Sequence, residues 1–171
     1  METRTLGSSA IEVSVVGLGC NNFGMKIDLA ESRAVIDAAL AAGITCFDTA
    51  DMYGDGQSEE FLGQVLGARR NQVVLATKFG GHAMLYNTGE HWGRREHVFA
   101  SIDASLKKLK TDWIDLYQVH FPDPNTPIGE TMDALDTLVK QGKVRAIGHS
   151  NFSREQIHGA AEYATQSGST A

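Results

Sequence analysis

The residue types best suited to acid–base chemistry follow the short apolar runs of this sequence. Asp48 directly follows one such run, and Tyr53 lies five residues further on. Lys78 and His120 end the next two runs, and Ser150-Asn151 follow the last one. If these runs are parallel strands around a barrel, their carboxyl ends meet on one face, where catalytic residues of such barrels gather. We therefore expect these side chains to converge at one place.

The combination of tyrosine, lysine, aspartate and histidine suits the reduction of a carbonyl group. A tyrosine hydroxyl, with an ordinary pKa of about 10, is a poor acid at neutral pH. A lysine ammonium beside it favours the phenolate and makes proton transfer feasible, and an aspartate keeps the lysine charged and in place. A histidine can donate a hydrogen bond to a carbonyl oxygen on which negative charge develops. Positioned proton transfer of this kind accelerates a reaction by about 10²–10⁴-fold.

Each of these residues also has an ordinary structural interpretation when it is taken alone. Lys78 fits a solvated charge at a strand end, and His120 fits a hydrogen-bonded histidine of the core. Asp48 fits a helix cap or a turn residue, and Tyr53 fits a packing residue. Four such residues at successive strand ends favour a functional site over these interpretations taken together.

The elements that position these residues alternate between strand-like runs and amphipathic stretches. Strands are expected at residues 13–18, 44–47, 73–77, 114–119 and 144–147. Helices are expected at residues 29–42, 58–66 and 95–109, from Thr126 with Pro127 at the first helical position, and from Ser153 with Gln156 in capping-box register. Five consecutive βα units of this kind predict an α/β fold with a parallel sheet.

Two segments depart from this alternation of strands and helices. Residues 3–6 and 10–13, around Gly7-Ser8-Ser9, favour a small hairpin ahead of the first strand. Residues 79–94 form a glycine-rich stretch that we expect to be a long loop, and it holds His82, Tyr86, His91 and Trp92. A loop of that length in a compact domain is more often functional than not.

Composition excludes several classes of function. The chain has 171 residues and a net charge of −6, which argues against a nucleic-acid-binding module with a basic face. Its two cysteines, Cys20 and Cys46, form neither a metal-ligand spacing nor a disulfide framework, which favours a reducing compartment and a cytoplasmic protein. No signal-peptide pattern opens the sequence, and no apolar run reaches the ~18 residues of a membrane helix.

Motifs for other cofactors are not met. Gly17 and Gly19 follow a predicted strand, but the next glycine is Gly24, so the dinucleotide fingerprint of the Rossmann fold fails. Residues 51–60 miss the calcium-loop spacing because Tyr53 occupies a ligand position. The six histidines form no metal-binding motif, so we expect no metal.

Three longer segments of the chain resemble the signatures of the aldo-keto reductase family. The first is GITCFDTADMYG at residues 43–54, followed by Glu59 and Leu62-Gly63. The second is LKKL at residues 106–109, followed by DWIDLY at 112–117 and His120. The third, GKVRAIGHSNF at residues 142–152, is similar to the segment that places the nicotinamide ring in that family. The three occur in the family's order and extend over most of the chain.

The resemblance implies an NADPH-dependent reductase of aldehydes and ketones on a (β/α)8 barrel. Tyr53 would be the general acid, Lys78 would assist its ionisation, Asp48 would anchor Lys78, and His120 would orient the carbonyl. The resemblance further implies that Ser150 and Asn151 hold the carboxamide of the cofactor, with Asp48 beside it. Trp92 and Tyr86 would form part of the wall of the substrate pocket.

Length leads us to expect an incomplete barrel. Such barrels typically have about 250 residues, whereas residues 1–171 supply about five of the eight βα units and form a single partial barrel domain. The other part of the family's cofactor site would be lost by truncation or supplied by another chain. Open sheet edges predict self-association or a complementing chain.

Two alternatives to a reductase stay open at this stage. The chain could be a catalytically inactive interaction or regulatory module, like the family's channel-associated relatives. It could also be an isomerase or dehydratase on a similar scaffold, because a tyrosine–lysine pair can transfer protons without a hydride. The match at Ser150-Asn151 speaks against this last alternative.

Overall fold

The centre of the computed structural model is a parallel sheet of five strands. The structure describes residues 1–86, 89 and 91–169. The strands lie in the sheet in chain order, each hydrogen-bonded to the next, and comprise β3 (Gly17–Gly19), β4 (Cys46–Asp48), β5 (Val74–Phe79), β6 (Ile114–Val119) and β7 (Val144–His149). The predicted parallel α/β fold is thereby confirmed, although most strands differ by one or two residues from their expected bounds.

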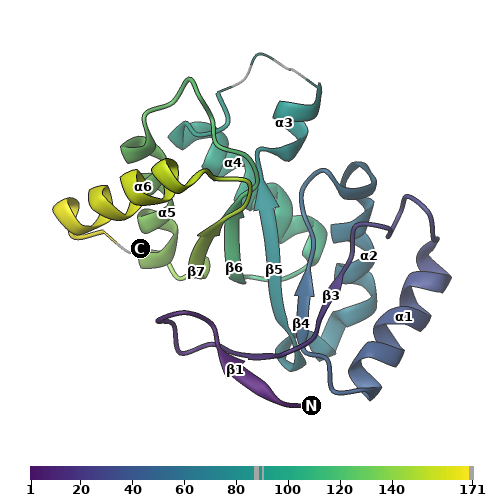
Figure 1. Ribbon diagram of the computed structural model, residues 1–171. Helices are drawn as coiled ribbons and strands as arrows, with labels where there is room; N and C mark the ends of the chain where they lie inside the picture. Colours follow the sequence, from purple (N-terminus) through teal and green to yellow (C-terminus); the bar gives the residue numbers. More distant parts are fainter. Residues whose placement is uncertain (87–88, 90, 170–171) are drawn as a thin grey trace.

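Helices between the strands cover the outer face of the sheet (Figure 1). They are α1 (Leu29–Ala41), α2 (Gln57–Leu66), α4 (Arg95–Leu109) and α5 (Ile128–Lys140), and short 3-10 helices, η1 (Tyr53–Gly56) and η2 (Gly67–Gln72), flank α2. Helix α6 (Arg154–Ser167) follows β7 and packs against α5. The capping box of Ser153 and Gln156 at the start of α6 is confirmed. Pro127 is instead the residue that precedes α5, because its ψ of 133° is extended rather than helical.

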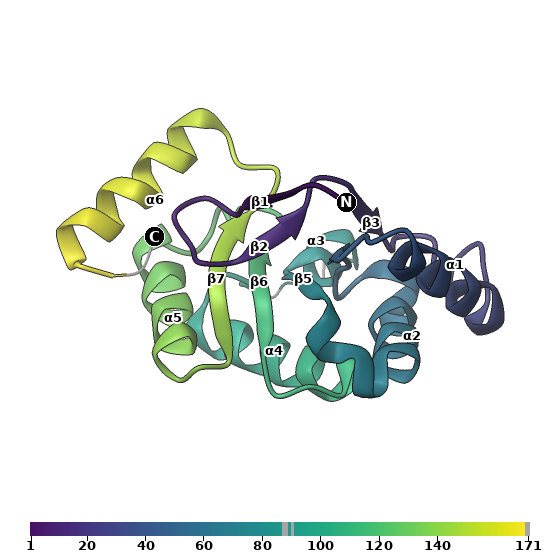
Figure 2. The same cartoon turned by 90° about the horizontal axis from the view of Figure 1, so that it is seen from below.

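The expected N-terminal hairpin is present. Strands β1 (Thr3–Thr5) and β2 (Glu12–Ser14) pair in antiparallel fashion. The hairpin lies below the amino ends of the sheet strands in Figure 1 and in front of the sheet in Figure 2. The first predicted strand, 13–18, is therefore wrong as one element, since its residues divide between β2 and β3. The break falls after Ser14, whose Oγ accepts hydrogen bonds from the Thr45 and Cys46 amides and so ties the hairpin to the start of β4.

The stretch 79–94 is not one long loop, which corrects the sequence-based expectation. Strand β5 continues to Phe79, and helix α3 (Gly81–Tyr86) follows almost at once. The amide of Met84 donates to the carbonyl oxygen of Gly80, which forms part of the turn that opens this helix. Helix α3 stands at the carboxyl-end edge of the sheet, as Figure 1 shows.

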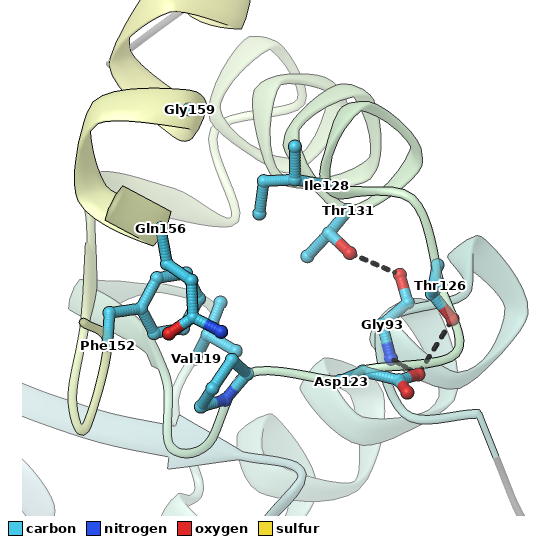
Figure 3. Close-up of a pocket in the computed structure, with 10 residues that line it drawn as sticks. Gly93, Val119, Asp123, Thr126, Ile128, Thr131, Phe152, Gln156 and Gly159 are labelled. Atoms are coloured by element: carbon cyan, nitrogen blue, oxygen red, sulfur yellow. Dashed lines mark hydrogen bonds between the residues drawn. The ribbon is translucent and has the colours of Figure 1, made fainter. Parts of the chain in front are cut away.

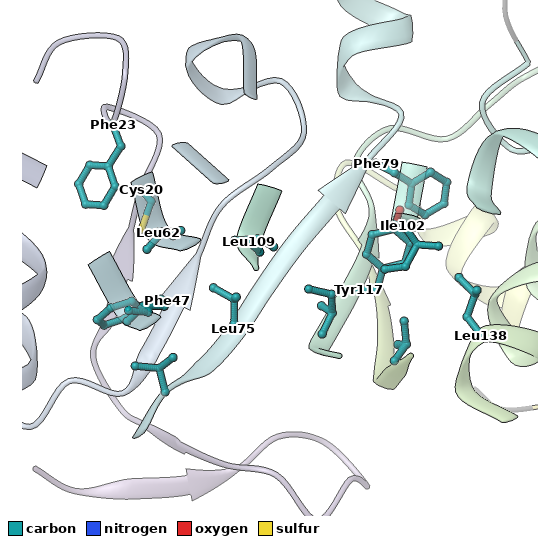
Figure 4. Close-up of a cluster of buried hydrophobic side chains, with 14 of the residues drawn as sticks. Cys20, Phe23, Phe47, Leu62, Leu75, Phe79, Ile102, Leu109, Tyr117 and Leu138 are labelled. Carbon is teal, nitrogen blue, oxygen red and sulfur yellow. The ribbon is translucent and has the colours of Figure 1, made fainter. Parts of the chain in front are cut away.

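The hydrophobic core fills the space between the sheet and its helices (Figure 4). Large side chains from the strands, such as Phe47, Leu75 and Tyr117, are less than 2% exposed. They meet equally buried side chains from α2, α4 and α5, among them Leu62, Ile102, Leu135 and Leu138. This packing fixes the strands against the helices, and so fixes the positions from which the strand ends project their polar residues.

A buried ionic network secures the opposite end of the sheet. Asp115, in β6, has a side chain only 2% exposed, and its Oδ2 accepts hydrogen bonds from Arg70 (2.8 Å) and from the Leu75 amide (2.9 Å). Its Oδ1 lies 2.6 Å from Arg145 Nη1. Burial by itself raises the pKa of Asp115, but the Leu75 hydrogen bond and the two guanidinium groups outweigh it and hold the pKa below its usual value.

One free edge of the sheet adjoins an open groove. Within the described residues, β3 and β7 are the outermost strands and pair on one side only. A groove of about 640 Å³ runs beside β7, bounded by α5, α6 and the hairpin tip, with Ala146, Ile147, Met132 and Ile157 among its lining residues. No helix in the described part of the chain is long and apolar enough to cross a membrane.

Removing the Asp115 carboxylate should destabilise the fold strongly. We expect Asp115→Ala to lower the free energy of unfolding by about 3–5 kcal/mol, because it leaves Arg70 buried without its partner. The matched control is Asp103→Ala, which breaks an ion pair with Lys143 whose aspartate side chain is 61% exposed, and it should cost about 1 kcal/mol or less.

Urea denaturation at several pH values would test this prediction. Because the pKa of Asp115 is lowered in the folded state, its contribution is present above the ordinary aspartate pKa and is lost as pH falls through the folded value. The free energies of unfolding of the unsubstituted protein and of Asp115→Ala should therefore converge at acid pH. If Asp115→Ala and Asp103→Ala lowered the free energy of unfolding equally at neutral pH, the prediction would be contradicted.

The unpaired edges should also drive association. Unprotected strand edges pair readily with other chains, and Val15 and Val16, just before β3, are 45% and 48% exposed. We expect light scattering to show dimers or larger species for the 171-residue chain. Ala146→Lys, which adds a charge on the edge strand β7, should reduce this association. A monodisperse monomer of the unsubstituted chain would refute the expectation.

Candidate active site

Lys78 lies at the centre of the cluster that the strand ends form. It is near the end of β5, its side chain is only 7% exposed, and its Nζ donates to Asp48 Oδ2 at 2.7 Å. The same ammonium donates to the carbonyl oxygen of Thr49 at 2.8 Å and lies 3.5 Å from the hydroxyl of Tyr53. A buried cation is thus paired with a carboxylate and placed within reach of a phenol.

The chain between β4 and α2 folds back sharply to deliver Tyr53. The next residue, Gly54, has a φ of +59°, and a Cβ atom there would lie 2.6 Å from the carbonyl oxygen of Phe23. Only glycine fits this position without a shift of the backbone. The resulting turn places the Tyr53 ring 5.0 Å from Lys78 Nζ and edge-on to the ring of His120, with centroids 5.8 Å apart.

His120 enters from the end of β6. Its amide donates to the carbonyl oxygen of Phe79, which extends the ladder between β5 and β6 by one residue. Burial, and then the positive charge of Lys78, lower the pKa of His120 to about 4, against the opposing influence of Asp48. The imidazole is therefore neutral at physiological pH, and a neutral imidazole still carries one N–H donor.

Ser150 and Asn151 reach the same edge from the end of β7. The amide of Ser150 donates to the carbonyl oxygen of Val119, and Asn151 Nδ2 donates to the carbonyl oxygen of His120 at 2.8 Å and to Ser150 Oγ at 3.1 Å. Asn151 adopts a φ of +59°, a left-handed conformation that asparagine tolerates better than most residues. The pair is thereby tied directly to the histidine of the cluster.

The two predicted pocket residues differ in their positions. The ring of Trp92 lies against Gly80, where a Cβ atom would come within 2.5 Å of it, and its Nε1 donates to the carbonyl oxygen of Phe121. Trp92 therefore borders the cluster. Tyr86 is 58% exposed, and its ring contacts that of His82 in α3, with centroids 4.5 Å apart. The structure does not bring Tyr86 into contact with the cluster of Asp48, Tyr53, Lys78 and His120.

Two residues that the sequence analysis did not single out also touch the cluster. Asp51 donates its amide to the carbonyl oxygen of Lys78 and accepts from the Gly80 amide through Oδ2, and burial together with Glu59 raises its pKa to about 6. Gln118 donates to Asp48 Oδ1 at 3.3 Å. The signal for Gln118 was available, because it lies two residues before His120 and residues two apart share one face of a strand.

A smaller pocket of about 150 Å³ lies beside this edge, between α5 and α6 (Figure 3). Asp123 spans its rim by accepting hydrogen bonds from the Gly93 amide and the Thr126 hydroxyl. Phe152, which follows Asn151 by one residue, forms part of its wall. None of Asp48, Tyr53, Lys78 and His120 lines this pocket. Within the described ranges, no group of three histidine, cysteine or carboxylate side chains could hold a metal ion.

Comparison with known proteins points to one family. The sequence model described as the Aldo/keto reductase family matches residues 15–168. Aldo-keto reductase YhdN of Bacillus subtilis is 44% identical over 163 residues, which cover 92% of this chain and 49% of that protein. A probable voltage-gated potassium channel subunit beta of Oryza sativa is 34% identical and covers 92% of this chain and 48% of its own length. The chain thus spans about half the length of these relatives.

Solved structures agree with the sequence comparison. A thermostable aldo-keto reductase, Tm1743, crystallised with the inhibitor epalrestat, superposes with a TM-score of 0.82 at 32% identity, over 95% of this chain and 58% of that one. Aldo-keto reductase AKR11C1 from Bacillus halodurans, in its holo form, gives a TM-score of 0.82 at 35% identity, over 96% and 54%. The five-stranded sheet corresponds to about five of the eight βα units of the family's (β/α)8 barrel, and the chain belongs to the aldo/keto reductase family.

Proposed function

We propose that this chain carries the proton-transfer half of an NADPH-dependent reductase that converts aldehydes or ketones to alcohols. The observation that carries the proposal is the buried Lys78, which pairs with Asp48 at 2.7 Å and lies 3.5 Å from the Tyr53 hydroxyl. A neutral His120 stands at the edge of the same tyrosine ring. Family membership supports an oxidoreductase in general terms.

Each residue has a distinct task in the proposed reaction. The reduced nicotinamide, when bound, supplies a hydride to the carbonyl carbon. Tyr53 gives its hydroxyl proton to the carbonyl oxygen, and the ammonium of Lys78 stabilises the phenolate that is left. Asp48 keeps Lys78 charged and oriented. His120 donates a hydrogen bond to the same oxygen, where negative charge develops during the transfer.

The polar groups at the end of β7 suit the nicotinamide end of such a cofactor. A carboxamide has one carbonyl acceptor and one NH2 donor group, and a serine hydroxyl and an asparagine side chain offer complementary partners. Ser150 and Asn151 lie next to His120, so a carboxamide bound there would place the ring close to Tyr53. Asp48, whose side chain is 40% exposed, is a further candidate to contact the cofactor.

The remaining elements of the proposal concern substrate, compartment and partners. We assign a small carbonyl compound as substrate, with Trp92 and Tyr86 as candidate wall residues of its pocket.

Both cysteines, Cys20 and Cys46, are free thiols, which supports the cytoplasm as the compartment. The groove beside β7 supports a further polypeptide, from a second copy or a complementing chain, as a partner.

A second candidate function has one observation in its favour. Relatives 33–34% identical to this chain bear the name of probable potassium channel beta subunits, so an interaction or regulatory role without turnover is the alternative. The two functions differ in one measurable property, namely whether the oxidation of NADPH depends on an added carbonyl compound.

The reductase function is tested by NADPH oxidation in the presence of an aldehyde. We would assay the chain alone and the chain mixed with the part of YhdN that lies outside the match. We expect carbonyl-dependent oxidation in at least the mixed sample. Tyr53→Phe removes the proposed proton donor and should lower kcat by about 10²–10⁴-fold, while NADPH fluorescence titration shows unchanged binding. Turnover that survives Tyr53→Phe would exclude Tyr53 as the donor, and no turnover in either sample would favour the interaction role.

The state of His120 can be measured without any turnover. We expect NMR titration of its ring to give a midpoint near 4, so the neutral donor persists throughout the physiological range. Lys78→Met removes a nearby positive charge and should raise this midpoint towards the ordinary value of about 6.5. Lys107→Met, at an exposed position of α4, is the matched control and should leave it unchanged. A midpoint near 6.5 in the unsubstituted chain would contradict the neutral-donor role.

A further inference from the structure

The Asp48 carboxylate is held on both of its oxygen atoms. Lys78 donates to Oδ2 at 2.7 Å, and Gln118 Nε2 donates to Oδ1 at 3.3 Å. A carboxylate with a single fixed partner can still turn about its Cβ–Cγ bond, whereas donors on both oxygens fix the plane of the group. Gln118 therefore restrains Asp48 from the side opposite the lysine.

The strand register explains why this glutamine reaches Asp48. Lys78, Gln118 and Gly148 are aligned across β5, β6 and β7, and residues aligned in this way in neighbouring parallel strands project from the same face of the sheet. Gly148 contributes no side chain to the row. A Cβ atom at that position would lie 3.3 Å from Gln118 Cγ and 3.3 Å from Leu116 Cδ1, so the glycine preserves the space that the Gln118 side chain occupies.

Restraint matters at Asp48 because its side chain is 40% exposed, whereas that of Lys78 is only 7% exposed. A carboxylate open to water can exchange its protein partners for solvent. If Asp48 turned away, the lysine would keep only the Thr49 carbonyl as a close partner, and its distance to the Tyr53 hydroxyl would no longer be fixed.

We propose that Gln118 is a positioning residue for the reaction, one that locks Asp48 so that Lys78 stays within reach of the Tyr53 hydroxyl. This inference rests on the proposed reductase function. Gln118 acts through Asp48 and need not touch the substrate. It is the amide N–H, and not the bulk of the side chain, that performs this task.

Two substitutions separate hydrogen-bond donation from packing. Gln118→Leu removes the donor, and Gln118→Glu keeps the size and shape of the side chain but, when ionised, has no donor. We expect both to lower kcat by about 10-fold, because small displacements of catalytic groups reduce rates steeply, with the KM for the carbonyl substrate nearly unchanged. A packing role predicts instead that Gln118→Glu retains the original kcat, and that result would overturn the proposal.

A second pair of variants leaves Gln118 itself intact. Gly148→Ala places a methyl group 3.3 Å from Gln118 Cγ and should displace the glutamine by a few tenths of an ångström, which should give a smaller loss of kcat in the same direction. Gly159→Ala in α6 is the matched control, because a Cβ atom there meets nothing within 4 Å. Equal kcat values for the two alanine variants would count against the proposed geometry.

A readout independent of turnover distinguishes failure of this inference from failure of the reductase function. In the ¹⁵N spectrum of lysine-labelled protein, we expect the ammonium protons of Lys78 to exchange slowly with water and to exchange faster in both Gln118 variants. If the unsubstituted chain turns nothing over, the reductase function fails while this exchange still tests the positioning. Lys78 exchange that is identical in all three proteins would overturn the positioning role, whatever the activity.

Discussion

The arrangement of this protein depends on the ion pair between Lys78 and Asp48, which lies partly out of water at the carboxyl edge of a parallel sheet. A buried ammonium is tolerated only when it is paired and hydrogen-bonded, and Lys78 meets this condition through Asp48 and the Thr49 carbonyl. The pairing requires β4 and β5 to lie side by side in a fixed register, with Asp48 opposite Ala76. Lys78 lies two residues beyond Ala76, so its side chain projects from the same face of the sheet as that of Asp48.

The same charge also sets the properties of its neighbours. Together with burial, Lys78 keeps His120 neutral, so that the histidine is available as a hydrogen-bond donor without becoming a competing cation. Asn151 ties the end of β7 to the backbone of that histidine. Tyr53, His120 and the candidate cofactor-binding residues are thus connected, and displacement of one of the strands that carry them would disturb the others.

The two ends of the sheet differ in how completely their polar groups are paired. At the amino end, the buried Asp115 pairs with the buried Arg70 and with Arg145, whose side chain is half exposed. The carboxyl end instead carries groups whose hydrogen-bonding capacity is not used up, such as the buried Nδ1 of His120, which has no partner among the described residues. Unsatisfied groups are costly in a protein interior, and the packed core and the ionic network supply the stability that offsets them.

The amino-acid sequence by itself determined the order of strands and helices along the chain, because the period-two and period-3.6 patterns that mark them are local. It also predicted that Asp48, Tyr53, Lys78 and His120 converge, because Asp48 follows an apolar run, Tyr53 lies five residues beyond it, and Lys78 and His120 end the next two runs. Local sequence patterns missed the strand break after Ser14, which depends on the contacts of Ser14 with Thr45 and Cys46. They also missed helix α3, which begins at the turn formed by Gly80 and Gly81. The spacing of Gln118 from His120 placed it on the same strand face, but its contact with Asp48, like that of Asp51 with the Gly80 amide, is made between segments far apart in the sequence. Which side chains meet across strands depends on register, which only the tertiary structure fixes.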